Sequence, residues 1–214
     1  MNQSKRAKAL RGVAGLLLTA GVVAGCAQLA TGDSSVSADT IAMMKASFKS
    51  QGPVTVDAIL NQDQAQKICS ERTEGVSKDV AKQIEETELK SINPPSDGKY
   101  LGDWKRGEVV AQNGSGLQFT DKVGGTNGGN CYACHQLAPK EISYGNIGPS
   151  LYRYGKLRGN GDAIVKYTWG KVYDAQAYHA CSTMPRFGHN KVLTEQQIKD
   201  VVALLLDPAS PVNQ

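Results

Sequence analysis

No apolar run in this 214-residue sequence is long enough for a comfortable membrane-spanning helix, which needs roughly 20 such residues. The chain has one C-x-x-C pair and no second, so the paired-cysteine pattern of a structural zinc site is missing. No internal repeat is visible. Residues 1–25 hold four of the 24 Lys and Arg and none of the 20 Asp and Glu, so the remaining chain has no formal net charge. This neutrality argues against nucleic-acid binding, which needs a clustered basic face.

The N-terminus has the pattern of an export signal. A basic segment precedes residues 12–25, which are uncharged and mostly apolar. The segment Val23–Cys26 is similar to the bacterial lipobox, in which cleavage before the cysteine leaves a lipidated N-terminus. We therefore expect residues 1–25 to be a signal peptide of lipoprotein type, with Cys26 the lipidated residue. The alternative is an ordinary signal peptide cleaved further on, for example after Ala27. Either leader predicts a periplasmic protein, and lipid at Cys26 would anchor it to a membrane.

The rest of the chain divides by composition into a tether, an extension and a larger domain. Residues 26–38 form a polar tether, and residues 39–100 form a helical extension that ends in a linker. Consecutive prolines at 94 and 95 stop a helix and mark the linker. We place a domain at 101–214. Apolar periodicity predicts helices in the extension over residues 40–49, 56–71 and 77–92.

The pentapeptide Cys131–His135, of sequence CYACH, is the pattern that attaches c-type haem covalently. Two thiols at this spacing can each add to a vinyl group on one porphyrin edge, and the adjacent imidazole can ligate the iron. A redox disulfide and half a zinc site are the alternatives for a C-x-x-C pair. The four glycines that precede the motif and the absence of a βαβ pattern around it disfavour a thioredoxin-like site.

Two further helices are predicted on either side of this motif. Asp103 can cap a short helix whose Val109 and Val110 face inward. Thr194–Gln197 fits a capping box, in which the first and fourth residues cap each other. Apolar residues follow at the spacing of an amphipathic helix, and Pro208 lies beyond them. These residues are Ile198, Val201, Val202 and Leu205.

From about residue 102 to 206 the chain resembles the class I c-type cytochromes. The resemblance rests on an N-terminal helix, the C-x-x-C-H motif, a Gly-Pro loop, a Met-Pro and a C-terminal helix. It implies an all-α fold, a class I cytochrome c domain preceded by the helical extension, with one covalent haem c. In that family the two terminal helices cross closely, with a glycine against an aromatic residue. Gly107 supplies the glycine, but Ala111 and Leu204 stand where aromatic residues are expected.

The resemblance also implies two residues around the haem iron. Met184 lies 49 residues after His135, is followed by a proline and precedes the last helix, which matches the family's second axial ligand. His179 and His189 are the other candidates, and either would otherwise be a solvent-facing loop residue. A ligating imidazole normally donates its other N–H to an acceptor. The family uses a proline carbonyl, and the resemblance assigns that role to Pro149, although Gly-Pro also makes plain turns.

Two cysteines remain after Cys131 and Cys134 are assigned to the haem and Cys26 to the lipid. An even remainder in an oxidising compartment favours a disulfide bond between Cys69 and Cys181. This bond would join the extension to the loop that carries Met184. Two buried free thiols, or a functional thiolate at Cys181, are the alternatives.

Long stretches of the C-terminal half are similar to SoxX, the mono-haem subunit family of the SoxAX cytochromes of thiosulfate oxidation. The resemblance implies that the chain accepts electrons and has no catalytic residue of its own. It would complete a SoxAX-type L-cysteine S-thiosulfotransferase with a SoxA-type cytochrome, which couples thiosulfate to a cysteine of a SoxYZ-type carrier, and would pass electrons to a downstream cytochrome. The matching stretches are Tyr167–Gly170, Cys181–Gly188 and Leu206–Asn213.

Other functions remain open. The chain could be a free periplasmic mono-haem electron shuttle in a respiratory chain, or a haem enzyme or gas sensor with an open iron site. A ligating Met184 argues against the open site. If the SoxX reading holds, the exposed haem edge should lie near Met184–Gly188, with Arg186 as a contact to the partner rather than a catalyst.

Overall fold

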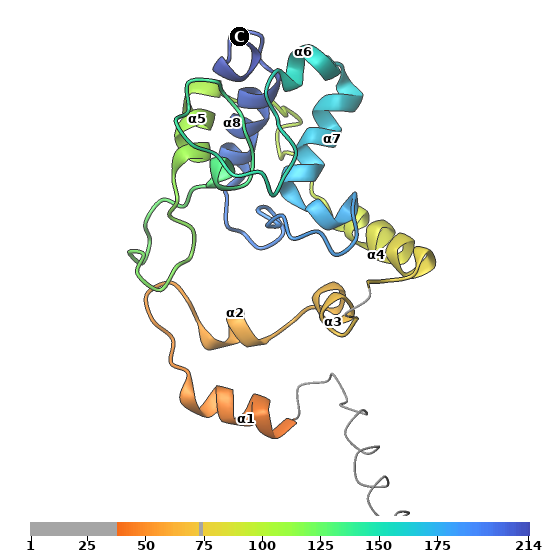
Figure 1. Cartoon of the computed structure of the whole chain (residues 1–214), viewed down its shortest axis with the longest axis vertical. Helices are drawn as coiled ribbons and strands as arrows, with labels where there is room; N and C mark the ends of the chain where they lie inside the picture. Colours follow the sequence, from red (N-terminus) through yellow and green to blue (C-terminus); the bar gives the residue numbers. More distant parts are fainter. Residues whose placement is uncertain (1–37, 73–74) are drawn as a thin grey trace, which may run out of the picture. The chain divides into compact units, whose positions relative to one another are not determined.

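The computed structural model describes residues 38–72 and 75–214, and over these residues the fold is all-α, as expected (Figure 1). The expected signal peptide, Cys26 and all but the last residue of the tether lie outside the described residues. Within the described ranges, no helix combines the length and apolar character of a membrane span. The α-helices are α1 (Ala38–Ser47), α2 (Val56–Leu60), α3 (Gln64–Ser70), α4 (Lys78–Ser91), α5 (Trp104–Gln112), α6 (Tyr154–Arg158), α7 (Asp162–Tyr173) and α8 (Glu195–Leu206). Short 3-10 helices are η1 (Cys131–Ala133), η2 (Ala175–Ala177) and η3 (Pro211–Asn213).

The chain divides between Thr40 and Ile41 into two units, and the second contains every element from α2 to η3. The helices expected over 40–49 and 77–92 correspond to α1 and α4. The single helix expected over 56–71 is wrong, because two helices form there. Asp63 accepts a hydrogen bond from the Gln66 N–H, and the Gln66 side chain accepts one from the Asp63 N–H. This capping box starts α3 anew and separates it from α2.

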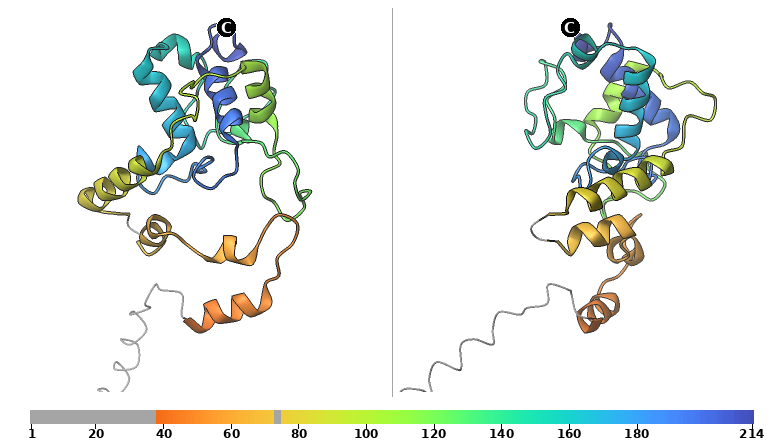
Figure 2. Two further views of the ribbon diagram at one scale, coloured as in Figure 1. Left: turned by 180° about the vertical axis from the view of Figure 1, so that it is seen from behind. Right: turned by 90° about the vertical axis from the view of Figure 1, so that its right-hand side faces the viewer.

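Helices α5 and α8 cross at close range, and a glycine permits the approach (Figure 2, α5 in green and α8 in blue). A Cβ atom at Gly107 would overlap the backbone oxygen of Asp200 and lie 2.9 Å from the Leu204 Cβ. Leu204 is fully buried at this point. The expected role of Gly107 is therefore confirmed, and an aliphatic side chain takes the place of the expected aromatic one.

The carboxylate of Asp200 fastens the same crossing. Its Oδ1 accepts the backbone N–H of Asp103 at 2.8 Å, and its two oxygens accept Nε and Nη2 of Arg106 at 2.9 and 2.8 Å. Asp103 also caps α5, as expected, by accepting the Lys105 N–H. Burial acts to raise the pKa of Asp200, but Arg106 and the Asp103 N–H outweigh it and hold that pKa below its usual value. A buried carboxylate thus ties the start of α5 to α8.

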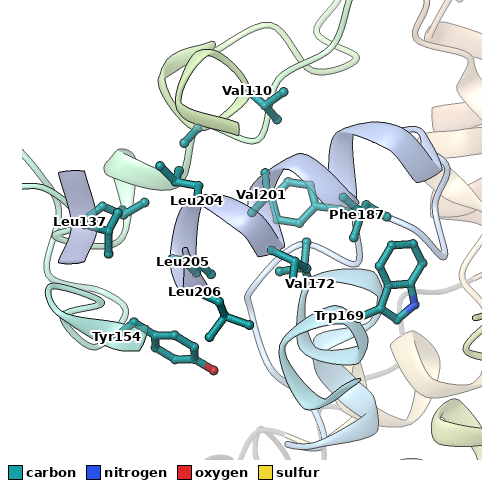
Figure 3. Packing of buried hydrophobic residues seen from close by; sticks show 14 of the residues in the cluster. Val110, Leu137, Tyr154, Trp169, Val172, Phe187, Val201, Leu204, Leu205 and Leu206 are labelled. Carbon is teal, nitrogen blue, oxygen red and sulfur yellow. The ribbon is translucent and has the colours of Figure 1, made fainter. Parts of the chain in front are cut away.

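The hydrophobic core lies among α5, α7 and α8 and the loops between them (Figure 3). The capping box at Thr194 is present, and nearly all of α8 after it is buried. On α5 the inward residues are Val110 and Ala111. The expectation that Val109 faces inward is wrong, since this side chain is 67% exposed. Successive residues on a helix point about 100° apart, so Val109 and Val110 do not share one narrow face.

The segment between α4 and α5 is held against the C-terminal part by hydrogen bonds and ring contacts. Nε1 of Trp169 donates to the Asn93 carbonyl at 3.0 Å. The rings of Tyr100 and Trp169 meet edge to face, with centroids 5.6 Å apart. Ser96 donates to the Glu195 carboxylate through both its N–H and its hydroxyl. This linker is therefore anchored along α7 and α8, although its sequence is typical of a free connection.

Candidate functional site

The C-x-x-C-H motif lies beside the C-terminal end of α5, and backbone hydrogen bonds hold the two together. The N–H of Gly129 donates to the Val110 carbonyl at 2.8 Å, and that of Asn130 donates to the Asn113 carbonyl at 3.0 Å. Asn130 adopts a left-handed conformation, with φ 45°, and turns the chain into η1. The N–H of His135 then donates to the Cys131 carbonyl at 2.9 Å. The motif is thus a tight turn in a defined position against α5.

The imidazole of His135 is oriented by the loop that contains Gly148 and Pro149. Its Nδ1 lies 2.7 Å from the Pro149 carbonyl oxygen, the acceptor that the family resemblance assigned. Because a carbonyl only accepts, Nδ1 carries the hydrogen and Nε2 keeps its lone pair for a metal. A Cβ atom at Gly148 would overlap the imidazole, so only glycine leaves space for the ring. This arrangement is the one that a haem-ligating histidine needs.

The two thiols of the motif are free and half-buried. Burial raises the pKa of the Cys131 thiol to about 12. Catalytic dithiols react as thiolates, and their sites lower the pKa of the cysteine instead. The surroundings of Cys131 therefore disfavour the redox-dithiol alternative. They are compatible with thiols that form thioether bonds.

Of the three candidates for the second axial ligand, Met184 has the most suitable surroundings. It is half-buried and packs against the hydrophobic core. His179 is exposed. His189 is not the solvent-facing residue that we expected, because its Nδ1 lies 3.2 Å from Oδ2 of the buried Asp174. The contacts of His189 leave Met184 as the favoured ligand, which stays a prediction.

Cys69 and Cys181 form a disulfide bond; their Cα atoms are 5.4 Å apart, and the two residues are 112 positions apart in sequence. The bond joins α3 to the loop that carries Met184. A second tie lies next to it, because the Ala180 N–H donates to Oε1 of Glu85 on α4 at 3.0 Å. The extension is therefore cross-linked to this loop three residues before Met184.

The expectation that Arg186 is an exposed partner contact is wrong. Arg186 is only 3% exposed, and its guanidinium lies among carboxylates from three parts of the chain. It forms an ion pair with Asp63, and its Nη1 lies 3.5 Å from Oε2 of Glu88 and 3.9 Å from Oδ2 of Asp174. Together with His189, these residues form what we call the charged cluster.

Sequence reasoning missed the charged cluster because its members are scattered along the chain and no motif links them. Asp63 is the N-cap of α3, Glu88 lies on α4 and Asp174 follows α7. The one signal was the cysteine pairing, which brings the residues around Cys69 close to those around Cys181. Burial, together with the adjacent carboxylate of Asp174, raises the pKa of Glu88 to about 7. The cluster therefore concentrates negative charge where water cannot solvate it well.

The chain is similar to proteins of known sequence and known structure. No protein-family model matches it. The crystal structure of SoxXA from P. pantotrophus is 25% identical, with a TM-score of 0.35, and the match covers 50% of this chain and 82% of that one. An uncharacterized lipoprotein of Aquifex aeolicus (strain VF5) is 43% identical over 162 residues, which are 73% of this chain and 75% of that protein. The chain therefore belongs to the same family as this Aquifex aeolicus lipoprotein.

Proposed function

We propose that the chain is a mono-haem c-type cytochrome that transfers electrons as the SoxX-like subunit of a SoxAX-type complex. The observation that carries the haem assignment is the His135–Pro149 contact beside the two free thiols. An imidazole whose Nδ1–H is held by a carbonyl at 2.7 Å, directly after C-x-x-C, has its Nε2 prepared for iron.

Different residues of the chain would hold the haem. The thiols of Cys131 and Cys134 would each hold a vinyl group through a thioether bond, which forms by addition of S–H and needs no oxidant. His135 would provide a nitrogen ligand and Met184 a sulfur ligand to the iron, and Pro149 fixes the imidazole. The haem iron supplies the one-electron chemistry when it is bound. Two protein ligands to the iron would leave no position there for a substrate, which favours electron transfer over catalysis.

The SoxX assignment rests on the sequence stretches in the C-terminal half. It gives the chain a SoxA-type cytochrome as partner, a SoxYZ-type carrier reached through that partner, and a downstream cytochrome as electron acceptor. Residues 101–214 would form the haem domain, and residues 39–100 the extension that braces the loop of Met184. Since Arg186 is buried, the partner contact must use other residues around this loop.

We further propose that Cys26 is lipidated and anchors the protein to a membrane on its periplasmic side. The lipobox at Val23–Cys26 supports this proposal, and the family relative in Aquifex aeolicus is itself called a lipoprotein. Mass spectrometry of the membrane-extracted protein should find a diacylglycerol-modified Cys26 at its N-terminus. A soluble mature chain that starts beyond Cys26 would instead support an ordinary signal peptide.

A pyridine haemochrome assay on the denatured protein tests the haem assignment. It should give one c-type haem per chain, and a Cys131→Ala, Cys134→Ala double variant should give none that survives denaturation. No covalent haem in the native chain would overturn the proposal.

Co-purification from the native organism tests the partner. A SoxAX-type subunit should bring down a second c-type cytochrome and show thiosulfate-dependent reduction only when that protein is present. Reduction by thiosulfate without any partner would contradict the proposal that the partner carries out the thiosulfate chemistry. Rapid electron exchange with respiratory cytochromes, with no stable partner, would favour the free electron shuttle.

A further inference from the structure

Three side chains of the charged cluster place ligand atoms around one point. Glu88, Asp174 and His189 each offer one atom, and these atoms all lie within 4.8 Å of one another. Nδ1 of His189 lies 3.2 Å from Oδ2 of Asp174 and 3.7 Å from Oε2 of Glu88. The three residues come from α4, from the end of α7 and from the loop before α8. The fold therefore brings together ligands that are far apart in sequence.

The spacing agrees with the requirements of a small divalent metal ion. Zinc binds histidine nitrogen and carboxylate oxygen at about 2.0–2.2 Å in tetrahedral sites, so neighbouring ligand atoms lie roughly 3.3–3.6 Å apart. The distances of 3.2 and 3.7 Å around His189 are close to this range. The ligand atoms of Glu88 and Asp174 lie within 4.8 Å of each other, so rotations of these two side chains can complete the site.

A buried oxygen without a hydrogen bond points independently to a missing ligand. Asp174 is completely buried, and its Oδ1 accepts the Gln176 N–H at 2.9 Å. Its Oδ2 has no hydrogen-bond partner and faces His189 and Glu88. Leaving such an oxygen unsatisfied is costly, because the lost hydration of a carboxylate is not replaced. A metal ion bound to Oδ2 would remove this cost.

The charged cluster holds more carboxylates than cations. When all three are ionised, Asp63, Glu88 and Asp174 bring three negative charges, and Arg186 brings one positive charge. Arg186 is already bound to Asp63, and its Nη1 is too far from Asp174 for a hydrogen bond. With a neutral His189, one divalent cation makes the sum zero. Buried charge of one sign is strongly unfavourable, so the cluster favours a dication.

We propose that Glu88, Asp174 and His189 bind one divalent transition-metal ion, with Zn²⁺ the natural occupant for this mixed nitrogen and oxygen set. Nδ1 of His189 is the ligand, because it faces both carboxylates. Nε2 faces Asp63 at 3.7 Å, which places a carboxylate where the N–H of a metal-bound imidazole can be held. The ion would tie α4 and the end of α7 to the loop that contains Arg186. It is separate from the haem and serves to brace the loop of Met184.

Zinc binding to the full mature protein, after treatment with a chelator, tests this proposal. Equilibrium dialysis against ZnCl₂ followed by elemental analysis should find about one tightly bound zinc per chain. His189→Gln and Glu88→Gln should each weaken zinc binding at least about tenfold, the loss that even indirect supports of a metal site cause. Added zinc should raise the melting temperature of the native protein, because a ligand that binds only the folded state stabilises it.

Two matched variants serve as controls. His179→Gln removes an exposed histidine from the same region, and Glu86→Gln removes an exposed carboxylate from the same helix as Glu88. Both should keep native zinc affinity. Circular dichroism checks that each variant is folded, and His189→Gln is the decisive one because this side chain is partly exposed. Absence of saturable zinc binding, or equal affinity in His189→Gln and His179→Gln, would overturn the proposal.

Discussion

Gly148 lies directly against the imidazole of His135, whose Nδ1 is 2.7 Å from the carbonyl oxygen of Pro149. Two adjacent residues of one loop thus act on the same ring in different ways. Pro149 fixes its tautomer, and Gly148 leaves the space that the ring occupies. The Gly148 N–H also donates to the Cys134 carbonyl at 2.9 Å, which holds the loop to the motif.

Gly148→Ala should displace the imidazole of His135 while leaving both thiols intact. The added Cβ overlaps the ring, so either the loop or the histidine must move. We expect covalent haem in lower yield, and a loss of low-spin iron in the fraction that forms, measured by absorption and electron paramagnetic resonance. Gly161→Ala is the matched control, because a Cβ there has nothing within 4 Å. An unchanged spectrum in Gly148→Ala would show that His135 is not held as described.

Met184→Ala tests the second axial ligand. A thioether stabilises ferrous iron, so its loss should lower the reduction potential and abolish the weak far-red band of ferric iron bound to sulfur. Protein-film voltammetry and near-infrared absorption measure the two effects. His179→Ala is the control and should change neither. If the histidine variant lost the band and Met184→Ala kept it, the ligand assignment would be wrong.

The disulfide should contribute strongly to stability. A Cys69→Ala, Cys181→Ala double variant frees a loop of 112 residues, which should lower the free energy of unfolding by about 2–5 kcal/mol. Its haem content should stay at the native level, because Cys131 and Cys134 are untouched. Urea denaturation measures the loss. Reductant should destabilise the native protein but not the variant, and equal stability of the two proteins would mean that the bond adds nothing.

Local sequence signals predicted the parts of the molecule that depend on neighbouring residues. The cap at Asp103 and the capping box at Thr194 follow from hydrogen bonds between residues two or three positions apart. The close approach at Gly107 followed from a family resemblance, since nothing local to α5 shows what α8 will present. The break between α2 and α3 also has a local signal, because the Asp63 side chain accepts a hydrogen bond from the Gln66 N–H. The apolar periodicity of residues 56–71 concealed this signal.

The charged cluster could not be predicted, because its contacts join residues far apart in the chain. Arg186 meets Asp63 across 123 residues, and no pattern around either residue marks the other. A lone arginine in a loop is usually solvated, which led to the wrong expectation of an exposed partner contact. Its ion-pair partners Asp63 and Glu88 both belong to the extension. The proposed haem-binding residues Cys131, Cys134 and His135, by contrast, lie in one short motif whose chemistry dictates their spacing.

Asp200 should make the stability of the α5–α8 crossing depend on pH. Arg106 and the Asp103 N–H, acting against burial, hold the pKa of Asp200 below its usual value of 3.8. The folded state therefore binds a proton less readily than the unfolded state. This contribution to stability is fully present above about pH 4 and is lost as the pH falls through the lowered pKa.

The Asp200→Asn variant tests this dependence. Asparagine keeps the size of the side chain but cannot pair with the Arg106 guanidinium as an anion, so the variant should be less stable at pH 7. Its free energy of unfolding should then fall less than that of the native protein between pH 5 and pH 3, because one acid-sensitive group is gone. Denaturant titrations across this range measure both slopes, and Glu86→Gln, which removes an exposed carboxylate from α4, is the control. Parallel slopes for the native protein and Asp200→Asn would show that Asp200 is not the group that couples this helix crossing to acid.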